Sequence, residues 1–451
     1  MLNYIWLGLI LLAVIIGGCL GNLKAVADQS FEMAKFAVLD TALPLVGIMA
    51  LWLGMMRVAE RAGLVTLLAR GLRPIMRWLF PEVPPEHPAM GSMLLNIAAN
   101  MFGLGNAATP LGLRAMRDLD SLNPRPGTAT NSMCTFLAIN TSSVQLIPVT
   151  AIAILAANRS VNPTAIVGTS IIATACAAIT AVTVAKLLAR SPIFRLDPPV
   201  SSHSTALNER RLEKPASEEK QVIKEAASLQ PLQWWGKLIL GVFIVFFLVL
   251  FLRLAFSTRA GVELTRLVST RQSHFVRVVD AISKLSIPFL LSMFPLYAAL
   301  RRVKVYEEFV EGAKEGFEVA IRIIPYLVAI LVAIGMFRAS GGMDLLKKML
   351  APVMLAVGFP PDLLPLALMR PLSGSGSVGL FTDLVRHFGP DSLIARMGGT
   401  IYGSTETTFY VLAVYFGSIG IKRTRYALVA GLAADFVGIV SSIVICRLMF
   451  R

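Results

Sequence analysis

Two short runs of polar side chains interrupt otherwise apolar stretches of this sequence. The first run consists of Asn140, Thr141, Ser142, Ser143 and Gln145. The second run consists of Thr405, Glu406, Thr407 and Thr408. A single Ser or Thr in an apolar helix usually hydrogen-bonds a neighbouring helix, at ~0.6 kcal/mol per contact. Four or five polar groups in succession, matched by a second run elsewhere, instead favour a binding site.

Glu406 is the residue of these runs with the strictest chemical requirement. An ionised carboxylate deep in a membrane costs about 2.5–3.5 kcal/mol or more, so Glu406 should be protonated, paired or in contact with a wet cavity. The alternative to a site is a salt bridge with Arg370 or Arg396. Arg370 could itself bind an anionic solute through its planar guanidinium, or it could neutralise Glu406. Asp435, in the last apolar run, is either a proton or cation group or a helix-packing acid.

Gly-, Ser- and Asn-rich segments near the polar runs add backbone groups to this candidate site. Segments 89–116 and 363–385 are too short or too polar to span a membrane alone, so they are predicted to be broken or re-entrant. A break inside a membrane exposes amides, which suit anions, and carbonyls, which suit cations. The further candidate solute-binding residues in or beside these breaks are Asn100, Asn106, Thr109, Ser373, Ser375 and Ser377.

The composition places these residues in a membrane protein. Of the 451 residues, 55% are hydrophobic and 15% are charged, where soluble proteins carry about a quarter charged residues. The net charge of +15 indicates basic cytoplasmic loops rather than a nucleic-acid partner. Apolar segments of the length that a spanning helix needs are predicted at 3–20, 37–56, 132–157, 163–188, 235–256, 284–300, 318–337, 398–420 and 425–449.

The two halves of the chain follow one plan. Pro44 and Gly54 correspond to Pro325 and Gly335, with the same spacing in each pair, and the polar runs correspond in order, with Ser142 at the place of Glu406. We therefore predict an all-α polytopic membrane protein of two homologous, transporter-like helical repeats with broken or re-entrant helices. The predicted domains are a first repeat at 1–190, a cytoplasmic charged linker at 191–231 and a second repeat at 232–451. Parallel and inverted repeats both stay open, with inversion preferred.

Several functions are excluded or disfavoured by what the sequence lacks. It contains no G-x-x-x-x-G-K-[ST] motif, so nucleotide hydrolysis cannot drive the protein directly. Its four cysteines form no C-x-x-C pair, and its four histidines are scattered. We predict no enzyme activity, no cofactor and no metal site.

The residues also carry a resemblance to a known family. Residues 1–190 resemble spore maturation protein A through N-I-A-A-N-M-F-G-L-G-N-A-A-T-P-L-G at 96–112 and C-T-F-L-A-I-N-T-S-S at 134–143. Residues 284–451 resemble spore maturation protein B through R-P-L-S-G-S-G-S at 370–377 and Y-G-S-T-E-T-T-F-Y at 402–410. The chain resembles a fusion of the two. These proteins share the nucleoside recognition, or Gate, domain with concentrative nucleoside carriers, which implies a multi-pass protein of the bacterial inner membrane.

The predicted function is binding or transport of a small hydrophilic solute, nucleoside-like by family analogy only and ion-coupled if active. The predicted partners are membrane lipids and that solute. A bound proton or cation and a homo-oligomeric state stay open. The alternatives are a non-transporting membrane scaffold for envelope or spore maturation, and the handling of a lipid intermediate.

Overall fold

The computed structural model describes residues 2–103, 105–194, 232–256, 274–356 and 358–450, and at a few helical positions only the backbone. This part of the chain is helical apart from connections and one isolated bridge between Thr128 and Arg423. Six of its segments are long and apolar enough to cross a membrane, namely Leu23–Arg61, Pro163–Arg190, Trp234–Phe256, His274–Leu300, Val305–Ala339 and Ala427–Met449. The predicted all-α polytopic fold is confirmed.

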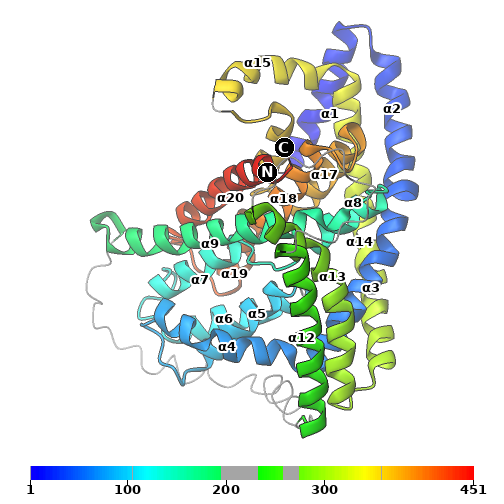
Figure 1. Ribbon diagram of the computed structural model, residues 1–451. Coiled ribbons are helices and arrows are strands. Elements are labelled where there is room, and N and C mark those ends of the chain that lie inside the picture. Colours follow the sequence, from blue (N-terminus) through cyan, green and yellow to red (C-terminus); the bar gives the residue numbers. More distant parts are fainter. Residues whose placement is uncertain (1, 104, 195–231, 257–273, 357, 451) are drawn as a thin grey trace.

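The helices of the two halves, drawn in Figure 1, follow the same order when α2 and α3 together are matched with α14. The first half contains α2 (Leu23–Phe36), α3 (Leu43–Arg61), α4 (Leu64–Leu79), α5 (Pro88–Met101), α6 (Gly105–Ser121), α7 (Asn131–Thr141), α8 (Val149–Ala157) and α9 (Ile166–Arg190). The second half contains α14 (Val305–Ala339), α15 (Gly342–Ala356), α16 (Leu364–Met369), α17 (Gly374–Phe388), α18 (Leu393–Ser404), α19 (Thr408–Ser418) and α20 (Ala427–Met449). Outside this plan are α1 (Leu2–Cys19), α12 (Trp234–Phe256) and α13 (His274–Leu300).

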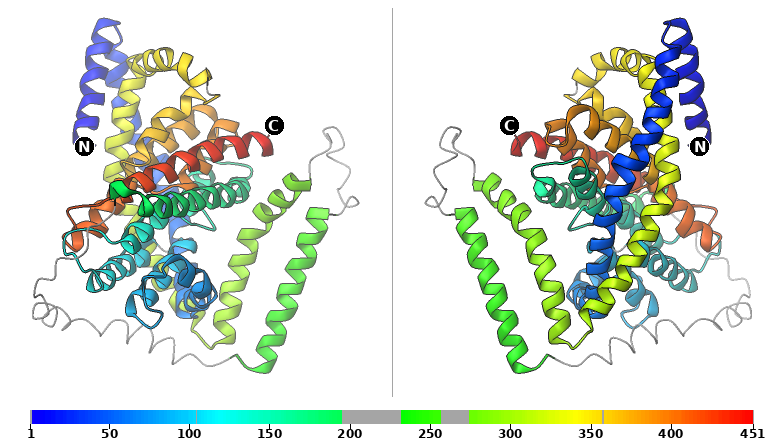
Figure 2. Two further views of the ribbon diagram at one scale, coloured as in Figure 1. Left: turned by 90° about the vertical axis from the view of Figure 1, so that its left-hand side faces the viewer. Right: turned by 90° about the vertical axis from the view of Figure 1, so that its right-hand side faces the viewer.

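The long helices of the two halves lie side by side and run in opposite directions (Figure 2). A π-helical stretch joins α2 to α3, so that the pair forms one long helix opposite α14. A Cβ added at Gly316 of α14 would touch Ala50, whereas one added at Gly335 would touch Met33. The contact therefore moves backward along α3 and α2 as α14 advances. Glycines let the two backbones approach closely, as is common between membrane helices.

The last helices of the two halves, α9 and α20, also pack antiparallel. Gly438 of α20 lies against Ala177, and Ala173, nearer the start of α9, clusters with Ile445 and Met449 near the end of α20. Two pairs of corresponding helices thus run antiparallel, which is the relation expected of inverted repeats. The preference for inversion stays a prediction, and the course of these two pairs agrees with it.

Two of the predicted spans are wrong as single helices. Segment 132–157 consists of α7 and α8 with a non-helical joint at 142–148, and segment 398–420 consists of α18 and α19 with a joint at 405–407. We call these the first joint and the second joint. Both polar runs therefore lie in or beside a joint and not at the centre of an intact helix.

Local chemistry explains why both helices stop where they do. The hydroxyls of Thr141, Ser142 and Thr405 each donate to a carbonyl three or four residues earlier, which offers the backbone an alternative to the next helical turn. In the first joint Ser143 has a φ of 46°, and Pro148 disfavours a helical conformation at the residue before it. In the second joint Thr405 is extended, with φ −135° and ψ 162°.

Between the two halves the structure describes a short 3-10 helix at Pro192–Phe194 and the long helices α12 and α13. These two helices pack against each other at one side of the molecule, and α13 also contacts α3 and α9 (Figure 2). Residues 195–231, which make up most of the predicted linker, lie outside the described residues. The domain boundaries at 190 and 232 stay predictions.

Candidate functional site

The two joints touch each other directly. The backbone N–H of Glu406 in the second joint donates to the carbonyl oxygen of Thr141, beside the first joint, over 3.0 Å. Helix α20 passes both: a Cβ added at Gly431 would touch Thr408 at 2.9 Å and Thr141 at 3.2 Å. The polar runs, 264 positions apart at Ser142 and Glu406, are thereby brought into one cluster.

Each joint is held by a helical hairpin of its own half in the same way. The N–H of Leu146, in the first joint, donates to the carbonyl of Met101 at the end of α5 over 3.0 Å. The N–H of Phe409, in the first turn of α19, donates to the carbonyl of Pro371 between α16 and α17, also over 3.0 Å. In both halves the adjacent hairpin thus accepts a hydrogen bond from an amide that no helix of the interrupted pair satisfies.

Arg370 fastens the second joint. Its side chain is 3% exposed, and its guanidinium donates to the carbonyl oxygens of Tyr402 and Thr405 and to the hydroxyl of Thr407, at 3.0 Å for Tyr402 and 3.4 Å for Thr407. The same group lies 4.4 Å from the centre of the Tyr402 ring. Arg370 therefore uses two of its five donors on backbone carbonyls and a third on a hydroxyl, so it holds the second joint together.

Glu406 is the accessible charged group of the cluster. Its carboxylate is 35% exposed and lies 3.9 Å from the Arg370 guanidinium, a long contact for an ion pair. One carboxylate oxygen accepts a hydrogen bond from the hydroxyl of Ser143 at 3.4 Å, and the other accepts from the Thr407 N–H at 3.3 Å. The salt bridge with Arg370 that the sequence left open is thus formed, while Arg396 instead lies 4.0 Å from Asp391.

A network of amides lies next to the first joint. Asn100 donates to the side-chain oxygen of Asn140 over 2.9 Å, and Tyr415 donates to the same oxygen over 3.4 Å. Asn96 is fully buried, donates to the carbonyl of Ala108 over 2.7 Å and contacts Tyr415. A small cavity is lined by Asn100 and Asn140 together with Ile97, Ile139 and Val144. It provides amide donors and acceptors beside an apolar wall.

Both joints are completed by the last helix of a half, but with opposite chemistry. In the first joint, the hydroxyl of Thr174 on α9 lies 2.9 Å from the Ser142 carbonyl oxygen and 2.6 Å from that of Ser143. Beside the second joint, the hydroxyl of Thr408 donates to the carboxylate of Asp435 on α20 over 2.6 Å. A neutral donor serves one joint and a buried acid serves the other.

The remaining predicted residues have more local roles. Ser373 caps α17 by accepting from the Gly376 N–H over 3.0 Å, Ser377 donates back to the carbonyl of Ser373, and Ser375 lies 3.4 Å from the Ser373 hydroxyl. The α17 start reaches the cluster, because a Cβ at Gly374 would lie 3.2 Å from the Thr407 hydroxyl.

Three predicted residues are described only in part. Gln145 and Thr109 are half-buried, and the side chain of Asn106 lies outside the described part. The predictions missed Asn96, Tyr415 and Thr174. The spacing of four between Asn96 and Asn100, which places both on one helix face, was a usable signal for Asn96, whereas Tyr415 and Thr174 gave none.

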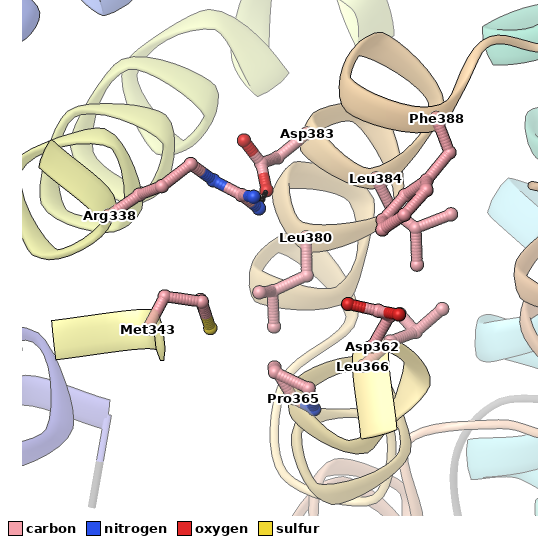
Figure 3. A pocket seen from close by; sticks show the side chains of 9 residues that line it. All are labelled: Arg338, Met343, Asp362, Pro365, Leu366, Leu380, Asp383, Leu384 and Phe388. Atoms are coloured by element: carbon pink, nitrogen blue, oxygen red, sulfur yellow. Dashed lines mark hydrogen bonds and ion pairs between the residues drawn. The ribbon is translucent and has the colours of Figure 1, made fainter. Parts of the chain in front are cut away.

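A second cavity lies away from the joints, between α14, α15, α16 and α17. Figure 3 shows Arg338 and Asp383 pointing toward each other across it, and the two side chains form an ion pair. Most of its other lining residues are apolar, including Met343, Leu380 and Phe388. Within the described residues, no group of three or more His, Cys, Asp or Glu side chains is placed to hold a metal.

The chain was compared with known proteins. The Gate family model, described as nucleoside recognition, matches residues 42–158 and 320–422, one stretch in each half. Spore maturation protein B of Bacillus subtilis (strain 168) is 47% identical over 175 residues, covering 39% of this chain and 98% of that protein. Spore maturation protein A of the same strain is 46% identical over 182 residues, covering 40% of this chain and 92% of that protein.

Two solved structures are similar over most of the chain. The YdaH transporter of Alcanivorax borkumensis has a TM-score of 0.42 and 16% identity, with 99% of this chain and 97% of that chain covered. MtrF of Neisseria gonorrhoeae, from a class of antimetabolite efflux pumps, has a TM-score of 0.36 and 13% identity, with 95% and 84% covered. Both TM-scores lie below 0.5, so these likenesses do not establish a shared fold.

The fold and the site define a multi-pass helical membrane protein of two related halves whose interrupted helices meet. The chain belongs to the spore maturation protein A and B family and carries its nucleoside recognition (Gate) domain. About two fifths of the chain matches more than nine tenths of each relative, as expected for a fusion of the two. The resemblance seen in the sequence is confirmed.

Proposed function

We propose that the protein binds a small hydrophilic solute where the two joints meet and carries it across a bacterial cytoplasmic membrane. The observation that carries this proposal is the contact between the joints at Glu406 and Thr141, with the accessible Glu406 carboxylate beside it. Interrupted helices that meet from two related halves are the usual construction of a substrate site in secondary transporters. The bacterial location is supported by the Bacillus subtilis relatives.

The chemistry of the cluster suits a neutral solute rich in hydroxyl and amide groups. Asn100 and Asn140 bring amide donors and acceptors to the cavity wall, where a solute could exchange with the bonds that they make to each other, and Ser143 adds a hydroxyl. Glu406 can accept from a solute N–H or O–H, and a charge-assisted hydrogen bond of this kind is about twice as strong as a neutral one. A nucleoside has this pattern of groups, and the description of the family domain supports the same class.

The proposal includes a proton or cation as the coupling partner at Glu406. A carboxylate that is about one third exposed and lies 3.9 Å from its paired guanidinium can exchange a proton or a monovalent cation when a solute arrives. The proposal is of a binding and transport protein, not an enzyme. The predicted site residues that it uses directly are Asn100, Asn140, Ser143 and Glu406, whereas Arg370 supports the second joint.

Nucleoside binding to the purified full chain, followed by counterflow in proteoliposomes, tests this function. We expect saturable binding of at least one nucleoside and a clearly weaker affinity in Glu406→Gln, which keeps the shape of the side chain and removes the charge. Glu311→Gln is the matched control, because Glu311 pairs with Lys314 on the exposed part of α14. A chain that binds no nucleoside and shows no counterflow would contradict transport and favour the scaffold or the handling of a lipid intermediate.

A further inference from the structure

Asp435 is the least exposed acidic residue that the structure describes, with 2% of its surface accessible. It lies in α20, one turn after Gly431 and one turn before Gly438, the glycines that face Thr141 and Thr405. This face of α20 is therefore pressed against both joints. The proposed solute site does not use Asp435.

The contacts of the carboxyl are too few for an ionised group. Oδ2 accepts one hydrogen bond, from the Thr408 hydroxyl at 2.6 Å, and Oδ1 has no hydrogen-bond partner among the described residues. No ion pair to Asp435 is formed in that part of the chain. A buried carboxylate without a paired cation is far more costly than a buried neutral carboxyl with one unmade hydrogen bond.

The charged groups that face Asp435 come from the second half. The fields of Arg370 and Glu406 reach it with opposite signs. Of the helices packed on α20, α7 and α19 contain no charged residue. Arg396 of α18 lies beside Asp391 and over the Phe450 ring, and Lys186, near the end of α9, donates to Trp78. Arg190, at the end of α9, is exposed. Among the described residues of these helices, none forms an ion pair with Asp435.

We propose that Asp435 is a proton-binding site, governed by its contact with Thr408 at the start of α19. The proton makes the enclosed carboxyl neutral, and the Thr408 hydroxyl donates to the carbonyl-type oxygen of the acid. Release of the proton would leave an anion that competes with Glu406 for Arg370. Because Arg370 also binds the carbonyls of Tyr402 and Thr405, proton release would act on the geometry of the second joint.

Infrared spectroscopy of the full chain in lipid vesicles tests the proposal without any solute. We expect a C=O stretching band of a protonated carboxyl at neutral pH and its loss in Asp435→Asn. Asp383→Asn is the matched control, because Asp383 is similarly buried but ion-paired with Arg338. Thr408→Val removes the hydroxyl donor and should shift the band to higher frequency without abolishing it.

The outcomes separate the proton site from the proposed function, because the C=O stretching band is measured without any solute. A spectrum in which Asp435→Asn and Thr408→Val leave the protonated-carboxyl region unchanged would overturn the proposal. If Asp435→Asn does not fold, the Thr408→Val shift alone decides. A higher C=O frequency in Thr408→Val supports the proton site, and an unchanged frequency counts against it.

Discussion

The two joints occupy corresponding places in related halves, yet they are built with different chemistry. The first joint is neutral: its freed carbonyls at Ser142 and Ser143 are satisfied by the hydroxyl of Thr174. The second joint contains Glu406, is held by Arg370 and lies against Asp435. Both are attached to a hairpin by one backbone hydrogen bond of 3.0 Å.

This difference shows which features of a joint are needed for folding and which are additional charged groups. A neutral joint suffices to interrupt a helix and hold it, because the first half does so without a charge. The charges of the second joint are therefore not required to form a joint of this type, and in a membrane they are expensive. We infer that they are retained for binding and coupling. The following variants test that asymmetry.

Arg370→Met is expected to have the largest effect. The substitution leaves the buried carbonyls of Tyr402 and Thr405 without a donor and removes the cation nearest to Glu406. Loss of one partner from a buried charged network typically costs about 3–5 kcal/mol, so the thermal unfolding midpoint should fall markedly. Arg322→Met is the control, since Arg322 is 80% exposed and pairs with Glu318 at 3.8 Å. Equal midpoints for both variants would make the second joint independent of its charges.

Glu406→Gln should act on solute binding and not on folding. A hydrogen bond to a charged group contributes about 1.5–3 kcal/mol, so nucleoside affinity should fall roughly 10- to 100-fold. Ser142→Ala, at the corresponding place in the first joint, removes a hydroxyl that bonds only its own helix and should leave affinity within about threefold. Titration of both variants with a labelled nucleoside measures this. Comparable losses in the two would mean that the joints share the chemistry equally.

Gly112→Ala should disturb the amide network of the first half. A Cβ at this position would overlap the hydroxyl end of Tyr415 and approach Asn96, so Tyr415 must leave Asn140. Overpacking of this kind costs about 1–3 kcal/mol, and nucleoside affinity should fall with it.

Gly379→Ala is the matched variant of the second half. Its Cβ would meet only apolar side chains, with Ile330 at 2.5 Å, so it should lower stability but leave nucleoside affinity unchanged. Nucleoside affinity is measured on both variants. If Gly379→Ala lost as much affinity as Gly112→Ala, the amide network would have no specific role in binding.

The smallest expected effect is a pH-dependent loosening of the contact between two loops. The loop before α18 is held to the loop after α8 through Asp391, which accepts from the Ser160 hydroxyl and the Val161 N–H. Burial by itself would raise the pKa of this carboxyl, but those hydrogen bonds outweigh it and hold the pKa below its usual value. A lowered pKa in the folded state means that the contact is fully formed above the ordinary aspartate value of ~3.9 and is lost as the pH falls through the folded value.

Hydrogen exchange under mild acid measures this loop. The Val161 N–H should lose protection as the pH falls, relative to the Ala129 N–H, which donates to the carbonyl of Arg423 in the corresponding contact of the other half. That second contact uses backbone groups and has no titrating acceptor. Parallel loss of protection at both amides would show that Asp391 does not set the difference.

The breaks in the two interrupted helices were not predicted from the sequence. The polar runs were recognised, but 132–157 and 398–420 were predicted as continuous spans because an apolar average over some twenty residues conceals a break of a few residues. A helix break also needs external donors for the carbonyls that it frees, and here Thr174 and Arg370 supply them. Both donors are brought to the joints by tertiary packing.

The sequence by itself determined the membrane class, the repeated order of helices and the polar residues of both runs, because composition and spacing are properties of the chain alone. Only the tertiary structure decided that Glu406 meets Thr141, that Arg370 serves the backbone of the second joint, and that Asp435 is enclosed beside Thr408. These contacts join residues from 27 to 265 positions apart. The antiparallel packing of α3 with α14 and of α9 with α20 accompanies the meeting of Glu406 and Thr141, whereas packing within the second half forms the other two contacts. Spacing along the chain encodes neither kind of packing.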